Sequence, residues 1–194
     1  MKTKLLLIML VLSFIMYGYT TSSTKTYKVD KQKTTVIVNG TSNLHDWETN
    51  VTNFDGELTA QTNSDNLIEG ITLLNVNFYA KSFNSGKSLM DNKTYDALKA
   101  DTYPLINFTL TSVTDKKLIN KVQQFTALGY LTIAGATKPV SLVALSTIGA
   151  NSEVYFQGTK TIDMTQFGVN PPTALLGTLT TGKDVTITFK LYFS

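Results

Sequence analysis

The amino-acid sequence predicts an all-β fold, an eight-stranded antiparallel barrel with one short helix. Apolar and polar residues alternate most regularly at the end of the chain, where the apolar positions are Val185, Ile187, Phe189, Leu191 and Phe193. Segments of similar alternation, rich in β-branched residues, recur along most of the sequence. Each such strand must bury one apolar face. A barrel of about eight strands buries these faces around an interior that is either filled or holds one small ligand.

The predicted strands follow one another with little intervening sequence. They cover residues 26–38, 51–60, 71–82, 106–111, 122–134, 139–148, 153–163 and 185–193. In the third strand the even positions Leu74, Val76 and Phe78 are apolar, and their neighbours Asn75 and Asn77 are polar. Turn-forming residues separate most of the strands. The polar face indicates that water covers one side of the sheet.

Residues 87–100 form the one segment with a helical pattern. Leu89, Tyr95 and Leu98 recur near the spacing of one helix face, which predicts an apolar stripe. Pro104 follows shortly afterwards, and the residue before a proline avoids the helical region. The helix is therefore expected to be short and to end before the fourth strand.

A β-hairpin is predicted around the next glycine-containing turn. Residues 130–134 are expected to form one strand, and residues 135–138 a tight turn in which Gly135 takes a positive φ. Pro139 has no N–H to donate, so it is expected at the first residue of the following strand.

Residues 1–22 have the pattern of a secretory signal peptide. Lys2 and Lys4 precede an uncharged apolar run over residues 5–16, and small or polar residues follow. The run is shorter than the roughly 20 residues that a membrane-spanning helix needs, which disfavours the alternative of an uncleaved anchor. We therefore expect cleavage and export to the periplasm or the medium, with residues 23–194 as the mature barrel domain.

Composition excludes several classes of function. All 17 basic residues are lysines, scattered along the chain against 14 acidic ones, so no nucleic-acid footprint is present. The absence of cysteine excludes disulfides, thiolate catalysis, cysteine-bound metal and a lipoprotein anchor. Charged residues make up 16% and hydrophobic residues 42% of the sequence, so the chain can bury a core and also line a cavity.

The sequence offers no convincing catalytic or metal site. His45 is the only histidine and lies between Ser42 and Asp46, but the glycine pattern of a nucleophile elbow is missing around Ser42. With one histidine and no cysteine, a metal would depend on carboxylates, and residues 91–96 lack the spacing of a calcium loop. We expect no enzyme activity, no catalytic residues and no metal.

Four segments, taken together and in this order, resemble the YceI-like family of exported barrels. They are GTSNLHDW (40–47), LKADTYPLINF (98–108), GYLTIAGATKPV (129–140) and FGVNPPTALLG (167–177). The resemblance extends over nearly the whole mature chain. Within the family, the chain is similar to the Bacteroidetes-type variant. The chain departs from the better-known members at Met90-Asp91-Asn92, where those members often carry an Arg-Asp pair. A contact from this loop to the headgroup of a bound lipid is therefore not implied for this chain.

The resemblance implies a lipocalin-like barrel whose elongated apolar lumen holds a polyisoprenoid chain in some members, and it carries over no catalytic residues. A bound polyisoprenoid or isoprenoid quinone is the only cofactor-like group expected. We predict that the protein sequesters or carries such a lipid, without stable membrane insertion. From the alternation of the strands, the predicted lumen residues are Leu74, Val76, Phe78, Phe108, Leu131, Ile133, Phe156, Ile187 and Phe189. Trp47, the only tryptophan, is placed near a mouth of the lumen, with a position in the core as the alternative.

Three alternatives stay open from the sequence. A secreted barrel with a filled interior would serve as a stress or interaction protein without a ligand. An outer-membrane barrel is suggested by the terminal strand near Phe193, although the polar faces of many strands disfavour it. An enzyme would depend on His45. The oligomeric state is also open, a dimer included.

Overall fold

The computed structural model describes residues 22–194, which form an all-β fold with one short α-helix. The strands are β1 (Ser23–Lys28), β2 (Thr35–Ser42), β3 (Trp47–Val51), β4 (Phe54–Thr62), β5 (Ile68–Tyr79), β6 (Phe83–Asn84), β7 (Leu105–Ile119), β8 (Val122–Ile133), β9 (Ala136–Ile148), β10 (Val154–Asp163), β11 (Thr173–Ala174) and β12 (Leu179–Phe193). The helix α1 spans Ser88–Ala97, and short 3₁₀ turns lie at Ala80–Ser82 (η1), Met164–Phe167 (η2) and Leu175–Gly177 (η3). The all-β class and the single short helix are confirmed.

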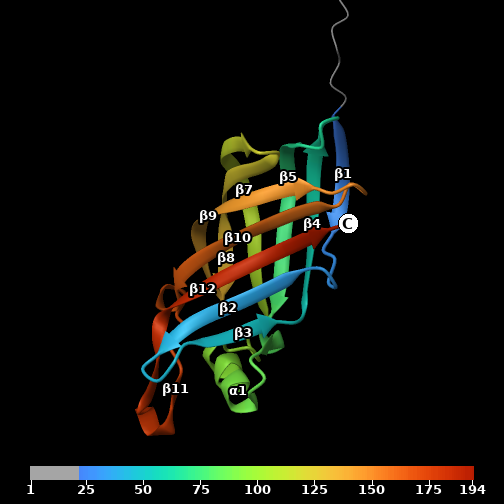
Figure 1. Cartoon of the computed structure of the whole chain (residues 1–194). Helices are drawn as coiled ribbons and strands as arrows, with labels where there is room; N and C mark the ends of the chain where they lie inside the picture. The colour runs from blue at the N-terminus through green and yellow to red at the C-terminus, as the bar shows by residue number, and fades with distance from the viewer. Residues whose placement is uncertain (1–21) are drawn as a thin grey trace, which may run out of the picture.

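Eleven strands follow one another in a single antiparallel sheet, in the order β1-β4-β5-β7-β8-β9-β10-β12-β2-β3-β6, and β11 pairs with β12 beside this path. The sheet curls strongly into a half-barrel, with α1 and β11 at one end (Figure 1). The predicted count of eight strands is therefore wrong. Within the described residues, the two strands at the ends of the sheet, β1 and β6, do not pair with each other.

A break in one predicted strand explains part of the difference. Residues 51–60 were expected to be continuous, but the chain bends at Thr52 and Asn53 and leaves β3 and β4 as separate strands. At the bend, the Thr52 N–H donates to Ser82 O (2.9 Å) and Asn53 O accepts from the Tyr79 N–H (3.1 Å). The chain thus pairs with β2 and β6 before the bend and with β1 and β5 after it. Alternation alone does not reveal a bend of this kind.

The hairpin between β8 and β9 is tighter than expected. Ala134 and Gly135 alone form the turn, with φ of 48° and 81°, and Ile133 pairs directly with Ala136. Both φ values are positive, as the commonest two-residue hairpin turn requires. Pro139 consequently lies inside β9, opposite Tyr130, and not at its first residue. Proline is accommodated here because β9 pairs with β10 only from Ala144 onward, so this part of β9 is an edge on its other side.

The end of the half-barrel that lies away from α1 is filled. Phe156 packs edge-on against Phe125 and Phe193, with ring centroids 5.8 and 5.9 Å apart, and Phe193 is fully buried. Backbone hydrogen bonds in both directions between Lys28 and Ser194 (3.0 and 2.9 Å) tie the end of β1 to the end of β12. These contacts close this end of the interior to solvent.

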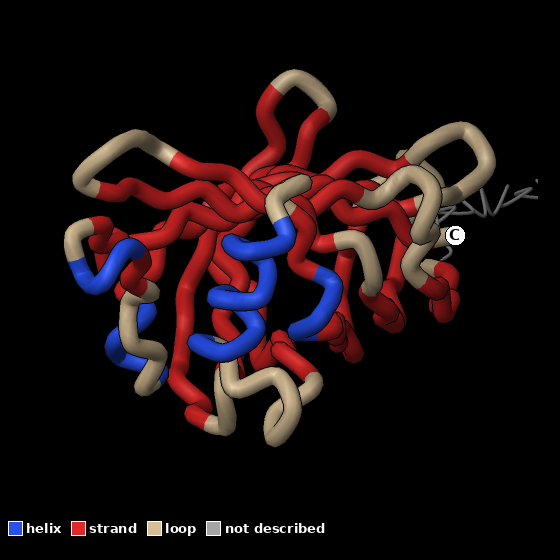
Figure 2. The backbone as a smooth tube through the Cα atoms, turned by 90° about the horizontal axis from the view of Figure 1, so that it is seen from below, coloured by secondary structure: helices blue, strands red, loops and turns tan. Residues whose placement is uncertain are grey.

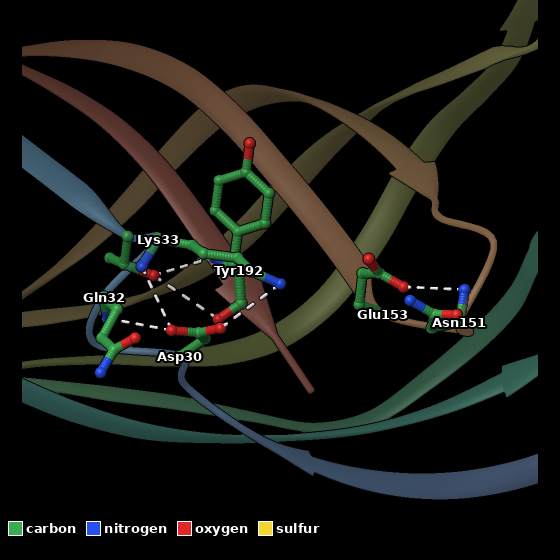
Figure 3. A network of polar contacts seen from close by, with 7 residues as sticks. Asp30, Gln32, Lys33, Asn151, Glu153 and Tyr192 are labelled. Carbon is green, nitrogen blue, oxygen red and sulfur yellow. Dashed lines mark hydrogen bonds and ion pairs between the residues drawn. The ribbon is translucent and has the colours of Figure 1, made fainter.

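A polar network surrounds the same end (Figure 3). The Asp30 carboxylate accepts hydrogen bonds from the N–H groups of Gln32 (2.9 Å) and Lys33 (3.2 Å) and forms an ion pair with the Lys33 ammonium. The Asp30 N–H donates to Tyr192 O (2.8 Å), and the Tyr192 N–H donates to the Thr34 hydroxyl (2.9 Å). The loop between β1 and β2 is thereby held against the last residues of β12.

Threonine pairs cover the outer face of several strands. Thr161 and Thr186 join β10 to β12 through their hydroxyls (2.9 Å), and Thr132 and Thr137 do the same across the β8–β9 hairpin (2.9 Å). Cross-strand hydroxyl pairs stabilise a sheet while leaving its outer surface polar. The apolar side chains of these strands therefore face the interior.

The predicted signal peptide lies, except for Ser22, outside the described residues. The division into a leader over residues 1–22 and a mature domain over residues 23–194 stays a prediction. Across residues 22–194, no helix combines the length and the apolar character that crossing a bilayer requires.

Candidate ligand-binding cavity

The concave side of the sheet encloses a cavity of about 430 Å³. This volume lies within the range of small-molecule binding sites. Its wall is predominantly aliphatic and aromatic and draws on most strands of the sheet. The alternative of a ligand-free barrel required a filled interior, and this cavity contradicts it.

All ten residues predicted to line the lumen lie on this wall: Trp47, Leu74, Val76, Phe78, Phe108, Leu131, Ile133, Phe156, Ile187 and Phe189. They come from β3, β5, β7, β8, β10 and β12. Alternation succeeds on these strands because a curled sheet sends every second side chain to its concave face. That these side chains contact a lipid stays a prediction.

The wall contains further residues that the sequence interpretation did not single out. Most are apolar positions of the same faces, such as Val36, Val38, Ile106, Leu110, Phe125, Val140, Leu142, Ile162, Val185 and Leu191. Each of them lies an even number of positions from a predicted lumen residue or another wall residue of the same strand, so alternation could have identified them. The contribution of α1 had no such signal, because a helix at the mouth follows from the tertiary arrangement.

The cavity lining reaches the end of the half-barrel that carries α1 and β11, since residues of both elements belong to it, and we call this end the mouth. Its outermost lining residues include His45 in the loop between β2 and β3, Leu89 and Met90 at the start of α1, and Thr173 of β11. Seen from this end, the helices lie in front of the arch of strands (Figure 2). Leu89, a member of the predicted apolar stripe, is 66% exposed at this end of the cavity.

Trp47 lies at this mouth because Gly40 lets its ring come close. A Cβ atom on Gly40 would be 2.2 Å from Trp47 Cζ2, so the indole lies directly over the backbone of β2. The indole N–H donates to Thr41 O (3.1 Å). The backbone contact and the hydrogen bond together fix the orientation of the only tryptophan in the chain.

The charged residues that line the cavity are all lysines. Lys87 and Lys93 lie on the mouth side, at the start of α1 and within it, and Lys160 lies on β10. Among residues 22–194 the ammonium groups of these three lysines form no ion pair, and no carboxylate lines the cavity. The cavity therefore has a positive electrostatic bias within a predominantly apolar wall.

Two buried hydroxyls in the described structure have no hydrogen-bond partner, those of Thr49 and Ser146. Thr49 is 2% exposed and lines the cavity, whereas Ser146 is 1% exposed and lies in the core beside Gln123, its cross-strand neighbour. An unpaired buried hydroxyl is unfavourable. Of these two residues, only Thr49 belongs to the cavity wall.

The residues around His45 do not assemble into a catalytic triad. The Ser42 hydroxyl donates to His45 O (2.7 Å) and accepts from the N–H groups of Leu44 (3.2 Å) and His45 (3.1 Å). The His45 ring contacts the backbone oxygen of Asp46 through Nδ1 (2.7 Å), not the Asp46 carboxylate. Ser42 thus stabilises a turn. Within the described chain, no group of three or more potential metal ligands comes together.

The fold is shared with several solved structures. BcnA of Burkholderia cenocepacia matches with a TM-score of 0.68 and 19% identity, covering 84% of this chain and 98% of BcnA. A polyisoprenoid binding domain from Saccharophagus degradans, implicated in plant cell wall breakdown, matches with a TM-score of 0.65 and 12% identity over 87% of this chain and 97% of that domain. The YCEI protein of Campylobacter jejuni matches with a TM-score of 0.58 and 20% identity over 74% and 82% of the two chains.

The comparisons do not support the finer assignment to a Bacteroidetes-type variant, since these structures come from Burkholderia, Saccharophagus and Campylobacter. A search of curated proteins gives no match. The YceI-like domain matches residues 27–193, which is nearly the whole described structure. The chain therefore belongs to the YceI-like domain family.

Proposed function

We propose that this protein binds an isoprenoid or similar lipid inside the cavity and sequesters or carries it. The observation that carries the proposal is the open, apolar cavity of about 430 Å³ on the concave side of the sheet. The similarity to a polyisoprenoid binding domain supports the same class of ligand. Apolar contacts supply enough affinity, because an isoprenoid of about 40 carbons at roughly 0.3 kcal/mol per heavy atom reaches about 12 kcal/mol, or nanomolar binding.

The proposal places this binding outside the cytoplasm, in the periplasm or the medium, on the basis of the predicted leader. A lipid has very low solubility in water, so an exported protein with an enclosed apolar site gives it a route through aqueous space. The apolar wall and polar exterior are the reverse of an outer-membrane barrel, whose lumen is polar and whose outer face is apolar.

Extraction of the purified secreted protein with organic solvent, followed by mass spectrometry, tests the proposal. We expect a co-purified isoprenoid or similar lipid, and uptake of an added isoprenoid quinone by protein from which the lipid has been removed. N-terminal sequencing of the same material tests cleavage of the leader. Repeated absence of any lipid, together with failure to take up quinone, contradicts the proposed function.

A matched pair of variants on β9 separates binding inside the cavity from adhesion to the surface. Val140 lines the cavity, whereas Val143 on the same strand is 51% exposed. Val140→Phe narrows the cavity and is expected to reduce the amount of bound lipid severalfold, and Val143→Phe is expected to leave it unchanged. Equal lipid content in the two variants would place the lipid on the outside of the protein.

A further inference from the structure

One cross-strand row of the cavity wall ends in two polar groups that have no partner among residues 22–194. Lys160 on β10 pairs with Ile187 on β12, Ile187 pairs with Val38 on β2, and Val38 pairs with Thr49 on β3. All four residues line the cavity. Neighbouring strands are about 4.8 Å apart, so Lys160 and Thr49 are about 14 Å apart along the wall, and the curl of the sheet brings them closer across the interior.

Lys160 faces the interior because of its place in β10. Val154, Phe156 and Ile162, at positions of the same parity, are buried, and the wall residue Ile187 is its partner on β12. Elsewhere on this strand the inward positions are apolar or glycine. Lys160 itself is partly exposed, and in the described residues no carboxylate pairs with its ammonium group.

Thr49 supplies the second observation. Its side chain is 98% buried, since 2% remains exposed, and its hydroxyl has neither a backbone nor a side-chain partner among the described residues. It lines the cavity at the same level as Lys160. Because Thr49 belongs to the cavity wall, its unpaired hydroxyl makes a molecule in the cavity a candidate partner.

We infer that this level of the cavity is a headgroup site and that the ligand is an anionic amphiphile, with a carboxylate or phosphate on an apolar chain. The headgroup pairs with the Lys160 ammonium and accepts a hydrogen bond from the Thr49 hydroxyl. The chain of the ligand lies against the aromatic and aliphatic wall. Lys87 and Lys93 at the mouth attract the same charge before it enters. This inference rests on the proposed lipid binding and specifies its ligand class.

Three probes with the same apolar chain test the inference: geranylgeraniol, geranylgeranoic acid and geranylgeranyl phosphate. Binding to the lipid-free protein is followed by the fluorescence of Trp47, the only tryptophan, which lies on the cavity wall. We expect at least one of the anionic probes to bind ten times or more tightly than the alcohol. Comparing the affinities of the acid and the phosphate shows which of the two anionic groups the site prefers.

Variants of Lys160 test whether this residue causes the preference for anionic probes. Lys160→Met is expected to remove the preference and to leave the affinity for geranylgeraniol unchanged, and Lys160→Gln is a second variant should Met impair folding. Lys190→Met is the matched control, because Lys190 lies on β12 but is exposed on the outer face. Thr49→Val is expected to weaken headgroup binding about fivefold, whereas Ser146→Ala, whose unpaired hydroxyl lies away from the cavity, is expected to leave it unchanged.

The outcomes distinguish this inference from the proposed function. Equal affinity of the wild type for the alcohol and both anions overturns the headgroup site and leaves lipid binding intact. A preference for anions that survives in both Lys160 variants also overturns it. Failure of all three probes to bind contradicts both the headgroup site and this class of lipid ligand.

Discussion

Ser146 and Thr49 have the same defect in two different environments. Both hydroxyls are buried and unpaired, but only Thr49 borders a space that another molecule can occupy. Losing hydration without gaining a hydrogen bond costs about 1–3 kcal/mol per group. In the proposed headgroup site a ligand would remove this cost for Thr49, whereas Ser146 lies outside that site.

Replacing either hydroxyl is therefore expected to stabilise the ligand-free protein. Ser146→Ala and Thr49→Val should each raise the free energy of unfolding by about 1 kcal/mol, because the unpaired group is removed with little change in shape. Urea denaturation measures this. Ser141→Ala, at an exposed position of β9, is the control and should change stability by less than about 0.5 kcal/mol. A loss of stability in Ser146→Ala would show that its hydroxyl has a partner.

Asp163 at the end of β10 predicts a dependence of stability on pH. Hydrogen bonds from the Lys183 ammonium (2.8 Å) and from Thr165 lower the pKa of its carboxyl from 3.8 to about 2. Because the folded pKa is the lower one, the charged carboxylate stabilises the fold. This contribution is present above the ordinary pKa of 3.8 and is lost as the pH falls through about 2.

Asp163→Asn is accordingly expected to have a lower urea midpoint than the wild type near neutral pH, and the difference should disappear at about pH 2. Asp101→Asn is a suitable control, since the Asp101 side chain is 88% exposed in its ion pair with Lys81. A difference between Asp163→Asn and the wild type that stays constant from neutral pH to pH 2 would contradict the role of the ion pair.

At the scale of single elements, a glycine in β2 determines where the Trp47 ring lies at the mouth of the cavity. Gly40 allows the Trp47 ring to lie against the strand, and a Cβ there would overlap the ring. Gly40→Ala is expected to displace the indole, to shift its fluorescence to longer wavelength and to lower stability by about 1–3 kcal/mol. Gly70→Ala on β5 is the control, because its Cβ would meet nothing closer than 3.4 Å. Unchanged emission in Gly40→Ala would contradict this packing.

The elements differ in how far the sequence predicts them. β12 and the part of β5 from Leu74 onward follow simple alternation, and their inward faces were predicted from it, as with Leu74 and Phe189. A shift in the pairing of β4 and β5 breaks the alternation before Leu74, so Ile71 also lines the cavity. The same rule placed Lys160 inward with Phe156, but an unpaired lysine in a lumen contradicts the usual expectation and the residue was not singled out. The position of Pro139 inside β9 was not predictable, because it depends on where β9 begins to pair with β10.

At the scale of the whole molecule, the sequence predicts which side chains face the interior and which face solvent, but not how far the sheet closes on itself. Alternation states which side chains share a face. The bend at Thr52 and Asn53, by contrast, depends on backbone hydrogen bonds to Ser82 and Tyr79, residues far along the chain. The strand count and the half-barrel follow from such long-range pairings, which leave no local pattern.

The distribution of polar and apolar faces predicts how the chain behaves without residues 1–21. A chain of residues 22–194 should fold in the absence of detergent, because its apolar faces are turned inward and its outer faces carry threonine, asparagine and lysine. Expression of this fragment, followed by gel filtration and circular dichroism, measures the result and also reports the oligomeric state. A requirement for detergent would contradict the assignment of the two faces.

The two strands at the ends of the sheet bear on self-association. β6 has only two residues, and β1 carries Lys25, placed over the Tyr27 ring (4.8 Å), and Lys28, paired with Glu57 (3.1 Å). A strand from a second molecule that joined β1 would have to approach these charges, and β6 offers too few backbone groups to serve as a template. The curled sheet therefore resists growth into fibres without any disulfide, which suits the proposed role of holding a water-insoluble lipid in dispersed molecules.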